Sequence, residues 1–147
     1  MSKAEEAKQL FESGANCAQA VAAAFAEECG ISREMALQMA SGFGGGMGRM
    51  REVCGAVSGM VMVAGLLRGN CDLDDKTAKD QDYALIQKLA ARFREETGSI
   101  ICRELLGRAP RQEDPPVSED RTAQYYKKRP CGEMVALAAA ILEEELL

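Results

Sequence analysis

The chain has 147 residues, a formal net charge of −5 and an apolar fraction of 47%, and this length fits one domain, residues 1–147, with a core of its own. The negative charge argues against a nucleic-acid partner, because binding phosphates requires a basic surface. The charged start lacks the apolar stretch of a signal peptide, and the longest uncharged run, 53–67, is shorter than the ~20 residues that cross a bilayer. We therefore expect a cytoplasmic protein without a membrane span.

The composition favours helices. Alanine, leucine, methionine and glutamate dominate, and β-branched residues form no sustained alternating run, which predicts an all-α fold: a compact single-domain bundle of about five to seven helices. In chain order the predicted helices span 3–12, 17 to about 28, 33–40, 53–67, 76 to about 96, 99–106 and 131–145. Asn16, Ser32 and Ser99 are the predicted N-caps, and Pro130 fits the first turn of the last helix.

Two groups of apolar residues at helical spacing predict buried faces. In the long helix this group is Tyr83, Ile86, Leu89, Ala90 and Phe93. The methionines predict core filling rather than ligation of a soft metal; they are Met35, Met39, Met47, Met50, Met60 and Met62.

Two stretches are predicted to connect helices. The glycine-rich segment 41–50 lacks the sequence of a phosphate-binding loop, so we expect a sharp turn that leads the chain to Cys54. The segment 107–120 is predicted to be a surface loop.

The six cysteines and the absence of histidine restrict the chemistry. In a reducing compartment, cysteines indicate metal binding or redox chemistry rather than structural disulfides. Cys17, Cys102 and Cys131 each fall in the first turn of a predicted helix, and Cys54 lies near the start of another. A helix N-terminus lowers a cysteine pKa from about 8.5 towards 3.5–7.5. We therefore expect these four candidate catalytic residues to converge on one sulfur-lined site.

Small residues follow Cys54. Gly55 and Gly59 share one helix face with Ala56 beside them, although glycine costs a helix about 0.5–1 kcal/mol relative to alanine. Such a face admits either the backbone of another helix or a cofactor next to Cys54, so Gly55, Ala56 and Gly59 are candidate cofactor-binding residues.

Basic residues precede two of the cysteines. Arg49 and Arg51 lie shortly before Cys54 and could hold a thiolate or an anionic ligand, or simply face solvent. Lys127, Lys128 and Arg129 precede Cys131, where their charge would favour the thiolate.

Four segments carry a family resemblance: "NCAQAV" at Cys17, "GFGGGMGRMREVCGAVSGMVMVAGL" at Cys54, "FREETGSIICRELLG" at Cys102 and "RPCGEMVALAAAIL" at Cys131. With these segments the chain resembles the redox-active protein family named for its C…CGAxxG…C…C pattern. The resemblance implies a redox role for the four cysteines but carries no defined reaction, and it leaves Cys29 and Cys71 without one.

Three functions fit these observations. The four cysteines could perform thiol/disulfide exchange or electron transfer without a cofactor, or ligate an iron–sulfur cluster or zinc, with Cys17, Cys54, Cys102 and Cys131 as the metal ligands. The chain could also be a non-catalytic helical interaction module. No CxxC occurs, which weakens the zinc hypothesis most and excludes a thioredoxin-type site. A redox partner protein or a small-molecule electron donor or acceptor is expected, and a homodimer is plausible.

Overall fold

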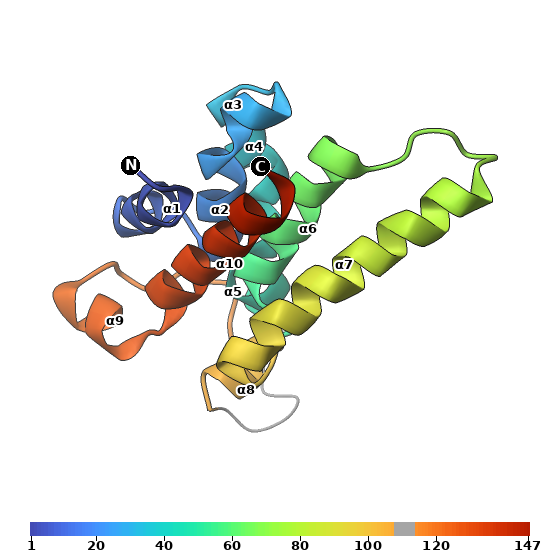
Figure 1. Ribbon diagram of the computed structural model, residues 1–147. Helices are drawn as coiled ribbons and strands as arrows, with labels where there is room; N and C mark the ends of the chain where they lie inside the picture. The colour runs from blue at the N-terminus through green and yellow to red at the C-terminus, as the bar shows by residue number, and fades with distance from the viewer. Residues whose placement is uncertain (108–113) are drawn as a thin grey trace.

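The computed structural model describes residues 1–107 and 114–147, and these residues form an all-helical fold (Figure 1), as predicted. In chain order the elements are α1 (Lys3–Glu12), α2 (Cys17–Ala24), α3 (Ala26–Cys29), α4 (Arg33–Ala40), the 3₁₀ turn η1 (Ser41–Phe43), α5 (Gly44–Met47), α6 (Gly55–Arg68), α7 (Lys76–Thr97), α8 (Cys102–Leu105), α9 (Ala123–Lys128) and α10 (Cys131–Leu146). Within the described residues the six longer helices, α1, α2, α4, α6, α7 and α10, carry the fold, and the others are short turns.

Helix α2 lies at the centre, in contact with α1, α4, α6 and α10, and α10 crosses in front of α2 and α6 in Figure 1. Their shared core includes the completely buried side chains of Phe25, Met60, Leu142 and Val21. Alanines make up most of the rest of α2, so neighbouring helices approach it closely.

The predicted helix from residue 17 to about 28 is two helices. α2 ends at Ala24, the backbone departs from helical geometry at Phe25 (φ −107°, ψ 10°), and α3 resumes at Ala26. The ring of Phe25 is completely buried at this break. Gly30 ends α3 in the left-handed conformation (φ 72°), as expected for a C-terminal glycine.

The long helix α7 packs only by its C-terminal half. Leu89 and Phe93 are completely buried, but Tyr83 is 62% exposed, so the predicted burial of Tyr83 is wrong. Figure 1 shows the reason: the first half of α7 projects away from the other helices. Near its other end, Arg92 forms ion pairs with Glu144 (2.7 Å) and Glu145 (3.0 Å) of α10.

The prediction that the methionines fill the core holds for Met60, which is completely buried, but it is wrong for four others. Met35, Met39, Met47 and Met50 are 37–49% exposed, because α4 and the glycine-rich segment lie at the surface of the bundle.

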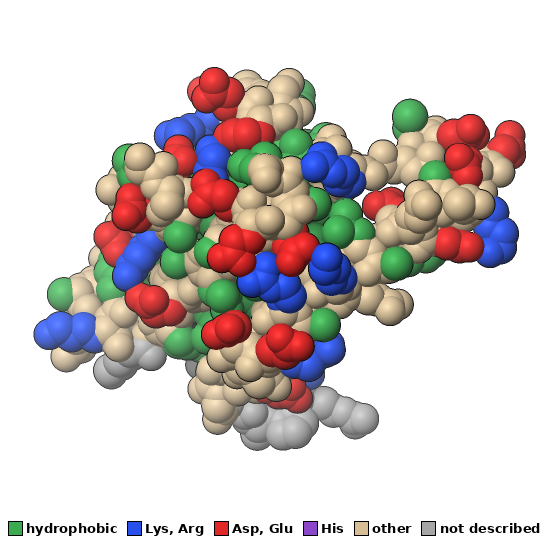
Figure 2. All heavy atoms as spheres, viewed as in Figure 1, with side chains coloured by type: hydrophobic (Ala, Val, Ile, Leu, Met, Phe, Trp, Pro, Cys, Tyr) green, Lys and Arg blue, Asp and Glu red, His purple; other side chains and the backbone are tan. Residues whose placement is uncertain are grey.

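In the predicted loop 107–120, residues 108–113 lie outside the described residues and 114–120 are irregular. The helix α9, which follows it, was not predicted. Figure 2 shows acidic and basic side chains interspersed over the face in view. No helix among the described residues has the length and apolar character that crossing a bilayer requires.

Candidate functional site

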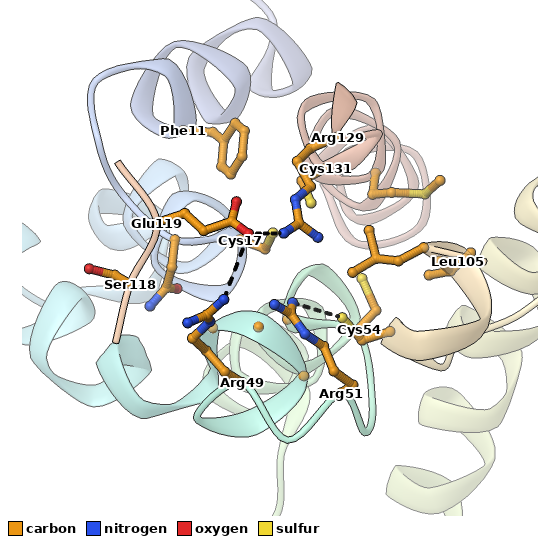
Figure 3. Close-up of a pocket in the computed structure, with 18 of the residues that line it drawn as sticks. Phe11, Cys17, Arg49, Arg51, Cys54, Leu105, Ser118, Glu119, Arg129 and Cys131 are labelled. Carbon is orange, nitrogen blue, oxygen red and sulfur yellow. Dashed lines mark hydrogen bonds and ion pairs between the residues drawn. The ribbon is translucent and has the colours of Figure 1, made fainter. Parts of the chain in front are cut away.

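All four cysteines of the predicted site begin helices and line one cavity of about 340 Å³ (Figure 3). Cys17, Cys102 and Cys131 are the first residues of α2, α8 and α10, and Cys54 is the N-cap of α6. The structure thus brings together residues that are up to 114 positions apart in the sequence. Among the described residues, the other two cysteines do not line this cavity.

The start of α2 is fixed by a capping box. The Gln19 backbone N–H donates to the Asn16 side chain (2.9 Å), and the Asn16 N–H donates to the Gln19 side chain (3.0 Å). The Asn16 amide also donates to the carbonyl of Ser41 (3.0 Å). These bonds hold Cys17, the next residue, against the glycine-rich segment.

A short antiparallel contact places Cys54 beside Cys102. The Cys54 N–H donates to the carbonyl of Ile100 (2.7 Å), and the Cys102 N–H donates to that of Glu52 (2.6 Å). The predicted N-cap Ser99 is therefore wrong: Ile101 is the N-cap of α8, and the Ser99 hydroxyl accepts from its N–H (2.9 Å).

The glycine-rich segment is the sharp turn that the sequence predicts. The backbone is left-handed at five of its positions and at Arg51 just after it; the five are Gly45, Gly46, Met47, Gly48 and Arg49. At the three that are not glycine this conformation costs about 1 kcal/mol or more each. A Cβ on Gly46 would lie 2.7 Å from the Cβ of Cys102, so only glycine lets the turn close against that cysteine.

The small-residue face of α6 is mainly a helix-packing surface. A Cβ on Gly59 would lie 2.9 Å from both the Ala18 carbonyl and the Val21 Cβ of α2, and Ala56 is completely buried. Ala56 and Gly59, two of the candidate cofactor-binding residues, are not among the residues that line the cavity. Gly55 does line it, and a Cβ on Gly55 would lie 3.1 Å from the Cβ of Cys17.

Cys17 and Cys131 are neighbouring thiols in the cavity wall, and each shifts the pKa of the other. The interaction with Cys17 lowers the pKa of Cys131 to about 7, and the charges of Arg129, Arg51 and Arg121 act in the same direction. The same interaction raises the pKa of Cys17 well above its usual range, and burial adds to the rise. One sulfur of the pair therefore ionises in part near neutral pH, while the other keeps its proton.

The expected lowering of all four pKa values is wrong for three of them. Burial raises the pKa of Cys54 to about 12, although the backbone N–H groups of Ala56 and Val57 oppose the rise. Burial also raises the pKa of Cys102, against the opposing effect of Arg51. The start of a helix does favour a thiolate, but desolvation of these buried sulfurs is the larger effect.

Arg51 is a buried arginine in the wall of the cavity, only 5% exposed. Its Nη1 lies 3.7 Å from the sulfur of Cys102, and its Nε and Nη2 donate to Asp114 (2.8 and 2.5 Å). In the sequence Arg51 is close to Cys54, but in the structure its guanidinium contacts the sulfur of Cys102. The antiparallel bridge between Val53 and Ile101 brings the start of α8 next to the segment that carries Arg51.

Further charged residues of the cavity come from the predicted surface loop 107–120 and from Arg121, which follows it. Glu119 accepts from Arg129 (2.5 Å) and lies 3.7 Å from Arg49. The Arg121 guanidinium stacks over the Phe11 ring (4.6 Å to the centroid). Asp114, Glu119 and Arg121 have no helical periodicity around them, and no sequence signal indicated that they reach the cavity.

The four cysteines are also the candidate ligands of a metal site. In the parts of the chain that the structure describes, no three cysteine, aspartate or glutamate side chains converge as they would around a metal ion. The four cysteines share a cavity, but the arrangement does not fit an iron–sulfur cluster or a zinc ion, whose thiolate ligands surround the metal closely.

The chain belongs to the family described as "Putative redox-active protein (C_GCAxxG_C_C)", whose family model matches residues 15–145. In this chain the order at 54–59 is Cys-Gly-Ala-x-x-Gly. No curated protein and no solved structure matches the chain.

Proposed function

We propose that this member of the redox-active family is a thiol/disulfide oxidoreductase in which Cys131 attacks and Cys17 resolves. The observation that carries the proposal is that Cys17 and Cys131 lie together in the wall of the shared cavity, where their thiols interact. Cys131 is the partly exposed member of the pair and Cys17 the buried one, which is the division of roles that exchange requires.

The reaction needs no cofactor. The Cys131 thiolate attacks one sulfur of a disulfide RS–SR, the S–S bond breaks and RS⁻ leaves, and Cys131 carries the mixed disulfide. The leaving thiolate takes the proton of Cys17, and the Cys17 sulfur attacks that of Cys131. A Cys17–Cys131 disulfide forms and the second RS⁻ is released. Two electrons have then passed from the cysteine pair to the substrate.

The neighbouring arginines support the first step. Arg129 and Arg51 lower the pKa of Cys131, so the attacking sulfur is partly ionised near neutral pH, where a free cysteine with a pKa of about 8.5 is mostly protonated. Exchange of this kind requires a reductant to restore the dithiol, and we infer a cytoplasmic location, where thiols are kept reduced.

The test uses protein purified and reduced without oxygen. After mild oxidation with a small disulfide we expect the loss of two thiols and a Cys17–Cys131 linkage by peptide mass mapping. Cys17→Ser should stop at a mixed disulfide on Cys131, and Cys131→Ser should not react at this site. Cys71→Ser is the matched control, because Cys71 is exposed and outside the cavity.

The proposal fails if the oxidised bond joins other cysteines, or if the reduced protein contains stoichiometric iron or zinc whose removal is required before any thiol reacts.

A further inference from the structure

The cavity wall is positively charged in a chain whose net charge is negative. Four arginines line the cavity, Arg49, Arg51, Arg121 and Arg129, and among the described lining residues the one carboxylate is Glu119. The whole chain has 18 basic and 23 acidic residues. Positive charge is therefore concentrated around the thiols, where it raises the local concentration of anions.

Arg51 and Arg121 are held by residues other than Glu119. Arg51 donates twice to Asp114 and contacts the Cys102 sulfur. Arg121 stacks over the Phe11 ring and donates to its carbonyl (3.1 Å). These contacts fix the two side chains as parts of the wall.

Arg49 and Arg129 converge on one carboxylate. Arg49 also donates to the carbonyls of Pro115 (2.9 Å) and Val117 and lies 3.6 Å from Asp114, so its guanidinium is already in place at the cavity. Figure 3 shows Glu119 between Arg49 and Arg129, with both guanidinium groups directed towards it. Glu119 belongs to the irregular segment after residue 114, and its side chain is 41% exposed. The protein thus holds its own carboxylate between two arginines at the cavity that contains Cys131.

We propose that the substrate is a small disulfide with a carboxylate, which replaces Glu119 between Arg49 and Arg129 and presents its sulfurs to Cys131. This inference rests on the proposed function. The cavity volume of about 340 Å³ equals that of about eleven waters at ~30 Å³ each, and it lies at the lower end of ligand pockets. A low-molecular-weight anionic disulfide fits these limits of charge and size.

Three disulfides with the same two-carbon spacer and different charge test the inference: 3,3′-dithiodipropionate (two negative charges), bis(2-hydroxyethyl) disulfide (neutral) and cystamine (two positive charges). The readout is the second-order rate at which the reduced protein forms the Cys17–Cys131 bond. We expect the dianion to react about tenfold faster than the neutral compound and the dication to be the slowest, with the differences shrinking in high salt.

Charge variants make the test specific. Arg49→Gln should lower the ratio of the dianion rate to the neutral rate about fivefold and raise the ratio of the dication rate to the neutral rate. Glu119→Gln should raise the first ratio and lower the second. If a substitution only made the segment 114–120 less ordered, the rates with all three disulfides would change in the same direction. Arg33→Gln, which removes an exposed arginine outside the cavity, should leave both ratios unchanged.

Equal rates for the three disulfides, or a preference for cystamine, would overturn the inference while the proposed exchange stands. Ratios that Arg49→Gln and Glu119→Gln leave unmoved would overturn it as well. If none of the three compounds yields the Cys17–Cys131 bond, the proposed function itself is wrong.

Discussion

Replacing Cys17 by alanine tests the central electrostatic claim, that the thiol of Cys17 favours the ionised form of Cys131. The interaction with Cys17 is the largest cause of a Cys131 pKa of about 7. A hydrogen bond to a charged group is worth about 1.5–3 kcal/mol, which corresponds to about one to two pKa units. In Cys17→Ala we therefore expect the pKa of Cys131 to rise to about 8–9.

The assay follows alkylation of Cys131 by iodoacetamide from pH 5 to 11, read from the mass of its peptide. The midpoint of this profile is the measured quantity. The rate at pH 7 should fall only about two- to sixfold, because a more basic thiolate is also the stronger nucleophile. Cys71→Ala, which removes an exposed thiol outside the cavity, should keep the parent midpoint. A midpoint in Cys17→Ala within about 0.3 units of the parent would refute the reasoning and leave the arginines as the cause.

Two further predictions concern stability. Gly59→Ala should lower the free energy of unfolding by about 1–3 kcal/mol, because its Cβ would lie 2.9 Å from the Ala18 carbonyl. Gly65→Ala in the same helix, with nothing within 4 Å, should raise it by about 0.5–1 kcal/mol, and urea unfolding of the pair compares them directly. Buried thiols with raised pKa values stay protonated in the folded state above pH 9 while the unfolded chain ionises, so stability should fall as the pH rises from about 9 towards 12. In reducing buffer, Cys54→Ala should flatten that fall by up to about 1.4 kcal/mol per pH unit, and an unchanged slope would contradict the burial of its sulfur.

Most of the helices could be predicted from the sequence, because their signals are local. Asn16 and Ser32 cap α2 and α4 as expected, and glycine or proline marks several helix boundaries. The wrong burial of Tyr83 has a different origin: spacing identifies an apolar stripe on a helix, but whether another element covers it depends on where the helix lies in the fold. α7 extends beyond the elements it packs on.

The convergence of the four cysteines was also predictable, whereas their environment was not. Each cysteine occupies the same local position at the start of a helix, so local reasoning assigns all four the same lowered pKa. The partners that distinguish them are distant in sequence: Arg51 reaches Cys102 across 51 positions. Such pairs carry no local signal.

The pKa values of Cys131 and Cys54 differ because the balance between burial of the sulfur and stabilisation of the thiolate differs at the two helix starts. Both sulfurs have the favourable field of a helix N-terminus. Cys54 is only 6% exposed and has the backbone N–H groups of Ala56 and Val57 as its stabilising partners; these do not offset the loss of water, and the pKa rises to about 12. Cys131 is partly exposed and adds a thiol donor and nearby arginine charges, which together outweigh its burial. Four cysteines that one sequence pattern treats alike are therefore unequal in chemistry, and the site has one sulfur suited to attack and others that are protected from it.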